Sequence, residues 1–102
     1  MNRQRLEQIF ENRIAECRET MGMKGKVYAT DENRLSNFYA GAELAKLTPQ
    51  QYAFSLVSKH IIALRDKINA DEPMSDEFIT EKMGDIINYM VLIEGLERED
   101  RE

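Results

Sequence analysis

Three polar residues near the C-terminus have the types and the spacing that metal or ligand chemistry requires. Glu81, Asp85 and Asn88 follow one another at intervals of four and three residues, so on a helix they share one narrow face. Two carboxylates one turn apart can both reach one divalent cation. An amide one turn further can orient a water molecule or read a base or a sugar. The spacing therefore predicts a site on this face, with Glu81 and Asp85 as its metal-binding pair.

An exposed helix could carry the same acidic pair without any ligand, but the neighbouring residues argue against that alternative. Apolar side chains cover almost the whole circumference of the segment: Met83, Ile86, Ile87, Tyr89, Met90, Val91, Leu92 and Ile93. A helix that is apolar all round must be buried on several sides. In so short a chain, we expect part of this burial to come from a homo-oligomer formed through the last helix. A central helix inside a monomeric bundle is the alternative.

Basic residues that could complement the carboxylates lie on the preceding helix. Lys59 and Arg65 could pair with Glu81 and Asp85, or Lys59 and His60 could contact phosphates. For His60 alone, a packed and hydrogen-bonded role is the alternative.

The segment of residues 23–37 contains a glycine and a polar cluster but no helical periodicity, so we expect an irregular loop. Two lysines, an aromatic ring, an arginine and an amide from this loop could grip a phosphate and stack a base. A solvated loop with its tyrosine against the core is the alternative. The candidate ligand-binding residues are Lys24, Lys26, Tyr28, Arg34 and Asn37.

Four helices would position these residues. The first, over residues 3–20, has an apolar stripe and is expected to end near Gly22. The second spans residues 35–47. The third starts at Thr48 and Pro49 and runs to about residue 69, and the fourth follows Ser75 as N-cap and runs to about residue 98. The sequence thus predicts a single all-α domain, residues 1–102, which is a small bundle of about four helices with one long irregular loop and a frayed end at 98–102.

Composition narrows the function classes. Fourteen basic and 19 acidic residues leave a net charge of −5, which disfavours nucleic acid as a partner. No stretch is long and apolar enough for a membrane span, and no secretory signal is visible. One cysteine and one histidine exclude a Cys/His zinc site within one chain, so the expected metal is a hard cation such as magnesium. A lone cysteine also fits a reducing, cytoplasmic location.

Residues 81–92, EKMGDIINYMVL, resemble the second half of the motif of MazG-like, all-α nucleoside triphosphate pyrophosphohydrolases. Residues 20–97 are more similar to small phage and prophage proteins related to the nucleotide-modification-associated domain. In those proteins a K…Y…D/N-R-x-x-N-F loop, a helix with a basic pair and EK-x-x-D-x-x-N-Y occur in this order. The corresponding segments here are KGKVYATDENRLSNF, Lys59-His60 and EKMGDIINY.

This resemblance implies a nucleotide ligand. Lys59, His60 and Arg34 would contact its phosphates, and Asn88 and Tyr28 would read or stack its base. Glu81 and Asp85 would hold magnesium or anchor Lys59.

The sequence departs from the MazG-like pattern in two places. The third helix has no EExxE, and Lys82 stands where a second glutamate of the last motif is usual. Because a two-metal site needs several carboxylates, the favoured function is a phage-type protein that binds a nucleotide, such as a signal of host defence, and sequesters it. One alternative is a magnesium-dependent pyrophosphohydrolase completed by Glu16, Glu19 or a second subunit. The other is a small acidic phage inhibitor that binds a host protein.

Overall fold

The computed structural model describes the backbone of residues 1–28 and 33–102, and the side chains of residues 1–22 and 33–102. Four α-helices make up this part of the chain: α1 (Arg3–Tyr28), α2 (Ser36–Ala45), α3 (Pro49–Asn69) and α4 (Asp76–Arg101). No strand occurs within these ranges. The all-α prediction is therefore confirmed. Among the described residues, no helix has the length and hydrophobicity of a membrane-spanning segment.

The starts of α3 and α4 lie where the sequence predicts them. The Thr48 side chain accepts a hydrogen bond from the Gln51 amide, and the Gln51 side chain accepts one from the Thr48 amide, a complete capping box before Pro49. The Ser75 hydroxyl accepts from the Phe78 amide at 3.1 Å. Both caps satisfy backbone donors that the first turn of a helix leaves unpaired.

The end of α1 differs from the prediction. The helix does not stop near Gly22 but continues to Tyr28, so residues 23–28 are helical rather than part of an irregular loop. A glycine ends a helix when its backbone turns left-handed. Gly22 does not do so, because no described glycine has a positive φ angle.

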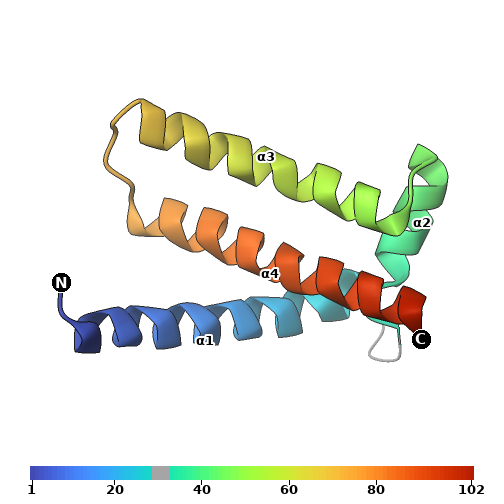
Figure 1. The fold of residues 1–102 in the computed structure, drawn as a ribbon, viewed down its shortest axis with the longest axis horizontal. Coiled ribbons are helices and arrows are strands. Elements are labelled where there is room, and N and C mark those ends of the chain that lie inside the picture. The colour runs from blue at the N-terminus through green and yellow to red at the C-terminus, as the bar shows by residue number, and fades with distance from the viewer. Residues whose placement is uncertain (29–32) are drawn as a thin grey trace.

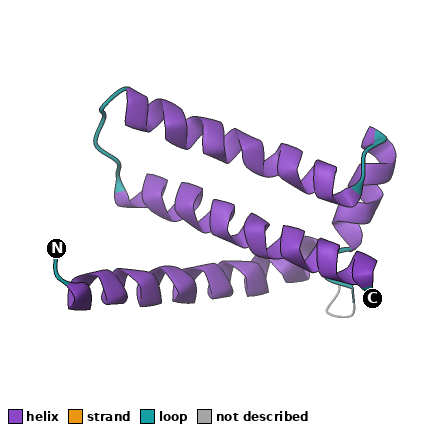
Figure 2. Ribbon diagram, in the orientation of Figure 1, coloured by secondary structure: helices purple, strands orange, loops and turns teal. Residues whose placement is uncertain are grey.

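The three long helices lie side by side, with α4 in the middle (Figure 1). The chain direction of α3 is opposite to that of α4, whereas α1 runs in the same direction as α4 and diverges from it towards their N-terminal ends. The short α2 crosses the end of the α3–α4 pair (Figure 2). Among the described helices, α3 and α1 therefore cover two sides of α4, and α2 reaches it through the contact of Phe38 with Tyr89.

The core formed within one chain is small. Only five apolar side chains are buried among the described residues: Cys17, Ala42, Ala53, Val57 and Leu96. Met90 and Val91 of α4 remain 42% and 54% exposed. The apolar circumference of α4 is therefore not fully covered by α1 and α3.

Candidate functional site

A cleft of about 870 Å³ runs along α4 and takes residues from all four helices and from the segment before α2. Three aromatic rings, two arginines, an aspartate and two asparagines contribute to it. Its lining residues are Arg18, Thr20, Met21, Gly22, Arg34, Asn37, Phe38, Tyr52, Leu56, Asp85, Asn88, Tyr89 and Leu92. A volume of this size is typical of small-molecule pockets.

Aromatic rings from three helices form the apolar walls of the cleft. The Phe38 ring meets the Tyr89 ring edge to face, with centroids 6.3 Å apart. The Tyr52 ring lies so close to Gly41 that a Cβ there would overlap it. Gly41 is therefore required for this placement of Tyr52. Rings held in this way offer flat surfaces on which a planar ligand can stack.

Two arginines bring positive charge to the cleft. Arg34 donates a hydrogen bond through Nη2 to the Met21 carbonyl oxygen at 2.8 Å, which links the segment before α2 to α1. Arg18 is solvent-exposed on α1, and it forms no ion pair with any side chain that the structure describes. A guanidinium group suits phosphate or carboxylate because its donors form a planar fork.

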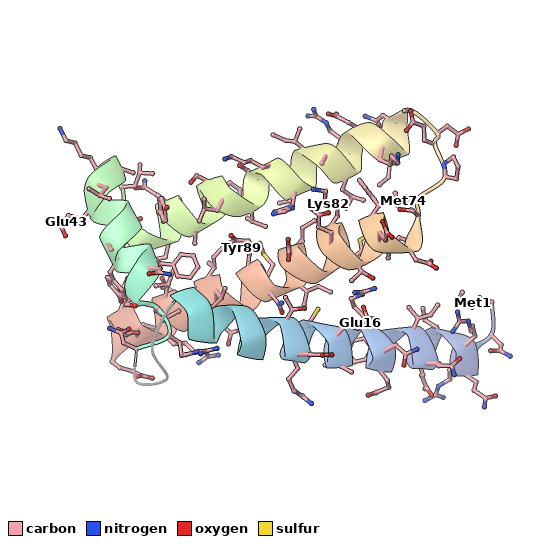
Figure 3. The ribbon with its side chains drawn as sticks, turned by 180° about the vertical axis from the view of Figure 1, so that it is seen from behind. Met1, Glu16, Glu43, Met74, Lys82 and Tyr89 are labelled. Carbon is pink, nitrogen blue, oxygen red and sulfur yellow. The ribbon has the colours of Figure 1, made fainter. Side chains whose placement is uncertain are left out.

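Asp85 connects the cleft to a cluster of ionisable groups between α3 and α4. His60 Nε2 lies 3.5 Å from Asp85 Oδ2, and the Tyr89 ring lies beside the imidazole at 6.2 Å between centroids. Lys82 Nζ lies 3.4 Å from His60 Nδ1 and 3.3 Å from Glu81 Oε1. Figure 3 shows Lys82 and Tyr89 on the side of α4 that faces α3.

This cluster contains the sequence-predicted metal pair together with a third donor. One ligand atom each from His60, Glu81 and Asp85 lies within 4.8 Å of the others. Two features make the set a poor match for magnesium. One donor is an imidazole nitrogen, whereas Mg²⁺ favours an all-oxygen octahedron. In addition, the Lys82 ammonium is already a cation next to Glu81 and His60.

Asn88 has a structural partner at the floor of the cleft. Its side chain is 9% exposed, and its Nδ2 donates to the Cys17 carbonyl oxygen at 3.1 Å. The Cys17 thiol in turn donates a weak hydrogen bond to the Gly84 carbonyl oxygen at 3.7 Å. Burial raises the pKa of this thiol, Arg13 opposes the shift, and Glu16 and Asp85 reinforce it. Asn88 thus fastens α4 to α1 and holds the cleft floor in place.

The structure brings some predicted site residues together and separates others. Arg34, Asn37, Asp85 and Asn88 line the cleft, and His60 and Glu81 adjoin it through the cluster. Lys59 is exposed and is not among the lining residues.

The two carboxylates pair with residues other than the predicted Lys59 and Arg65. His60 and Lys82 are the partners of Asp85 and Glu81, whereas Arg65 pairs with Asp66 at 3.0 Å. The side chains of Lys24, Lys26 and Tyr28 lie outside the described residues.

Sequence reasoning missed several residues of the cleft. Met21 and Gly22 follow Arg18 by three and four residues, so all three share one face of α1, and this face was visible in the sequence once the helix continues through Gly22. Tyr52 and Leu56 gave no such signal, because only the packing of α3 decides which of its faces meets the cleft.

No family model matches the sequence, and no curated protein or solved structure is similar to it. The resemblance of residues 81–92 to the MazG-like motif therefore stays a prediction from the sequence.

Proposed function

We propose that this chain binds a nucleotide or a nucleotide-derived signal in the cleft, without a metal ion, and keeps it intact. The observation that carries the proposal is the meeting of aromatic rings, guanidinium groups and a carboxylate in one cleft of about 870 Å³. Each of these three groups matches one part of a nucleotide. Their combination is more specific than any of them alone.

The aromatic walls support a base. Phe38, Tyr52 and Tyr89 present ring surface, and stacking of a base on an aromatic side chain contributes about 1–3 kcal/mol. Asp85 also lines the cleft, and a carboxylate can accept hydrogen bonds from the amino or imino groups of a base.

The arginines support phosphates. Arg18 and Arg34 border the cleft, and a guanidinium binds a phosphate through two parallel hydrogen bonds. The whole chain carries a net charge of −5, so these local positive charges are needed to attract an anionic ligand.

Lys82 favours binding over hydrolysis. Its side chain is only 17% exposed, and its ammonium already places a positive charge 3.3 Å from Glu81 Oε1 and 3.4 Å from His60 Nδ1. A hydrolytic metal site would need Lys82 displaced and further carboxylates supplied. A ligand held without metal activation stays intact, which is what sequestration of a signal requires.

The test is calorimetric titration of the purified protein with nucleoside triphosphates and with cyclic dinucleotides, each in EDTA and in magnesium. We expect at least one of them to bind with an affinity that magnesium does not increase, and to be recovered unchanged by chromatography. If none binds in either condition, the proposal is wrong.

A matched pair of variants locates the site. Arg18→Gln removes a positive charge at the cleft, and Arg5→Gln removes the same charge elsewhere on α1, where Arg5 donates to Gln8. We expect Arg18→Gln to weaken binding about tenfold, the equivalent of one charge-assisted hydrogen bond. Arg5→Gln should leave the affinity unchanged. Equal affinities for both variants would exclude the cleft as the phosphate site.

One observation keeps hydrolysis as the second candidate. His60, Glu81 and Asp85 can present three ligand atoms within 4.8 Å of one another, and the sequence resembles a hydrolase motif at the same place. Magnesium-dependent release of pyrophosphate, abolished by Asp85→Asn, would establish this candidate in place of the first.

A further inference from the structure

A large apolar surface of α3 and α4 lies on the side turned away from the cleft. Phe54, Ile61 and Ile68 recur every seven residues along α3 and are 57%, 40% and 57% exposed. A second stripe runs along α4 at intervals of four and three residues, with Met83 and Ile87 half-buried and Met90 exposed. These six residues form the back face of the chain.

Helix geometry sets the direction of the back face. At 100° per residue, its stripe on α4 is about 180° from the stripe of Asp85, Asn88, Tyr89 and Leu92 that lines the cleft. On α3, the exposed stripe is about 140° from Tyr52, Leu56 and His60. Because α3 and α4 lie side by side (Figure 1), the two stripes form one continuous surface opposite the cleft.

The chain as a whole exposes more surface than a monomer of its size. Its solvent-accessible area is 7760 Å², whereas a compact monomer of 11.9 kDa exposes about 6,000 Å². The radius of gyration is 15.4 Å, against about 13 Å for a compact domain of this length. The excess of about 1,800 Å² lies within the roughly 1,000–2,500 Å² that each subunit contributes to an obligate homodimer.

We propose that a second copy of this chain covers the back face. The small core requires a permanent cover, and another copy is the one partner present wherever the chain is made. A two-fold contact pairs a surface with itself, and the apolar residues of the back face on one copy would meet the same apolar residues on the other. The cleft, on the opposite side of α4, stays open to ligand in such a dimer.

The exposed apolar start of α1 adds to the surface available to a partner. Leu6 and Phe10 are 60% and 62% exposed, in the half of α1 that diverges from α4 (Figure 1). Isolated large apolar side chains are common on surfaces, but contiguous patches mark interaction sites. A second copy that reaches this half of α1 would bury these side chains as well.

Light scattering of the full chain at micromolar concentration tests the proposal. We expect a mass of twice 11.9 kDa, and a melting temperature that falls by about 5 °C on hundredfold dilution, because dissociation accompanies unfolding. A mass of one chain, with a melting temperature independent of concentration, overturns the proposal and leaves the face to a different partner.

Two isomeric apolar residues provide a matched pair of variants. Ile61→Asp places a carboxylate in the back face, whereas Leu44→Asp makes the same change on α2, where Leu44 is 87% exposed. We expect Ile61→Asp to yield single chains or to unfold at concentrations where the natural protein is a folded dimer. Leu44→Asp should keep the dimer mass. If Ile61→Asp also keeps that mass and melting temperature, the back face is not the interface.

Discussion

One face of α4 is polar and meets α1 and the cleft, and the opposite face is apolar. The polar face is the more deeply buried of the two. Towards α1 and the cleft, Asn88 is 9% exposed and bonded to a backbone carbonyl, and Asp85 lies against His60. On the other side, Met90 is 42% exposed. Hydrophobicity therefore does not decide burial along this helix. The neighbouring helices do, because each offers partners on one side only.

The two faces of α4 differ in how they can be covered, within the same chain or by another molecule. A polar side chain stays buried only where a hydrogen bond compensates for its lost hydration, and α1 supplies that bond through the Cys17 carbonyl oxygen. The apolar side needs only contact area, which any well-shaped surface supplies. The first side is thus specified within one chain, and the second is suited to association.

The largest expected effect comes from placing a charge on each side of α4. Asn88→Asp removes the donor to Cys17 and sets a carboxylate against its carbonyl oxygen, so we expect a loss of about 3 kcal/mol in the free energy of unfolding. Met90→Asp places the same charge about 200° round the helix. Its destabilisation should be large at high protein concentration and fade on dilution, because it acts on the proposed dimer contact.

Urea denaturation at two protein concentrations measures both variants. Asn37→Asp, an exposed residue at the edge of the cleft, serves as the control and should change stability by less than about 0.5 kcal/mol. The division would be contradicted if the loss of unfolding free energy depended on protein concentration for Asn88→Asp, or did not depend on it for Met90→Asp. Asn88 would then not act within one chain, or Met90 would not act at the dimer contact.

A smaller effect is expected at the wall of the cleft. A Cβ at Gly41 would overlap the Tyr52 ring, so Gly41→Ala should cost about 2 kcal/mol through overpacking and weaken the proposed nucleotide binding by displacing that ring. Gly22→Ala is the control, since a Cβ there meets nothing within 4 Å. It should stabilise the protein by about 0.5–1 kcal/mol, because it restricts the unfolded chain at a helical position. Thermal unfolding and the affinity of each variant check both expectations.

The smallest effect concerns the thiol behind Asn88. Burial raises the pKa of Cys17 above its ordinary value of 9.0, so the folded protein holds this proton more tightly than the unfolded chain does. The stability that depends on it is intact below about pH 9 and declines as the pH rises further. The natural protein should lose more stability between about pH 8 and about pH 10 than Cys17→Ser, which does not titrate there. Equal losses would show that the thiol is not protected.

Local signals in the sequence were sufficient for most helix boundaries but not for all. Thr48-Pro49 and Ser75 mark their helices because a cap acts within three or four residues of itself. The extension of α1 through Gly22 was missed, since a glycine is compatible with both a helix interior and a helix end. The residues on its C-terminal side decide between these two conformations.

The candidate site was only partly predictable for a geometric reason. Glu81, Asp85 and Asn88 share one face of a helix, and helical spacing alone places them there. Lys59 and His60 are adjacent in the sequence, yet only His60 meets Asp85. Neighbouring residues point about 100° apart on a helix, so the rotation of α3, set by the burial of Ala53 and Val57, decides which of the two faces the carboxylate.

The helix starts at Thr48 and Ser75 and the shared face of the acidic residues could be read from the sequence, because they depend on interactions within a few residues along the chain. The packing of the helices, by contrast, brings Phe38, Tyr52 and Tyr89 to one cleft, places Lys82 against Glu81 and His60, and leaves the back face exposed. These features depend on how helices distant in sequence are rotated and packed against one another, which no spacing within a single helix encodes.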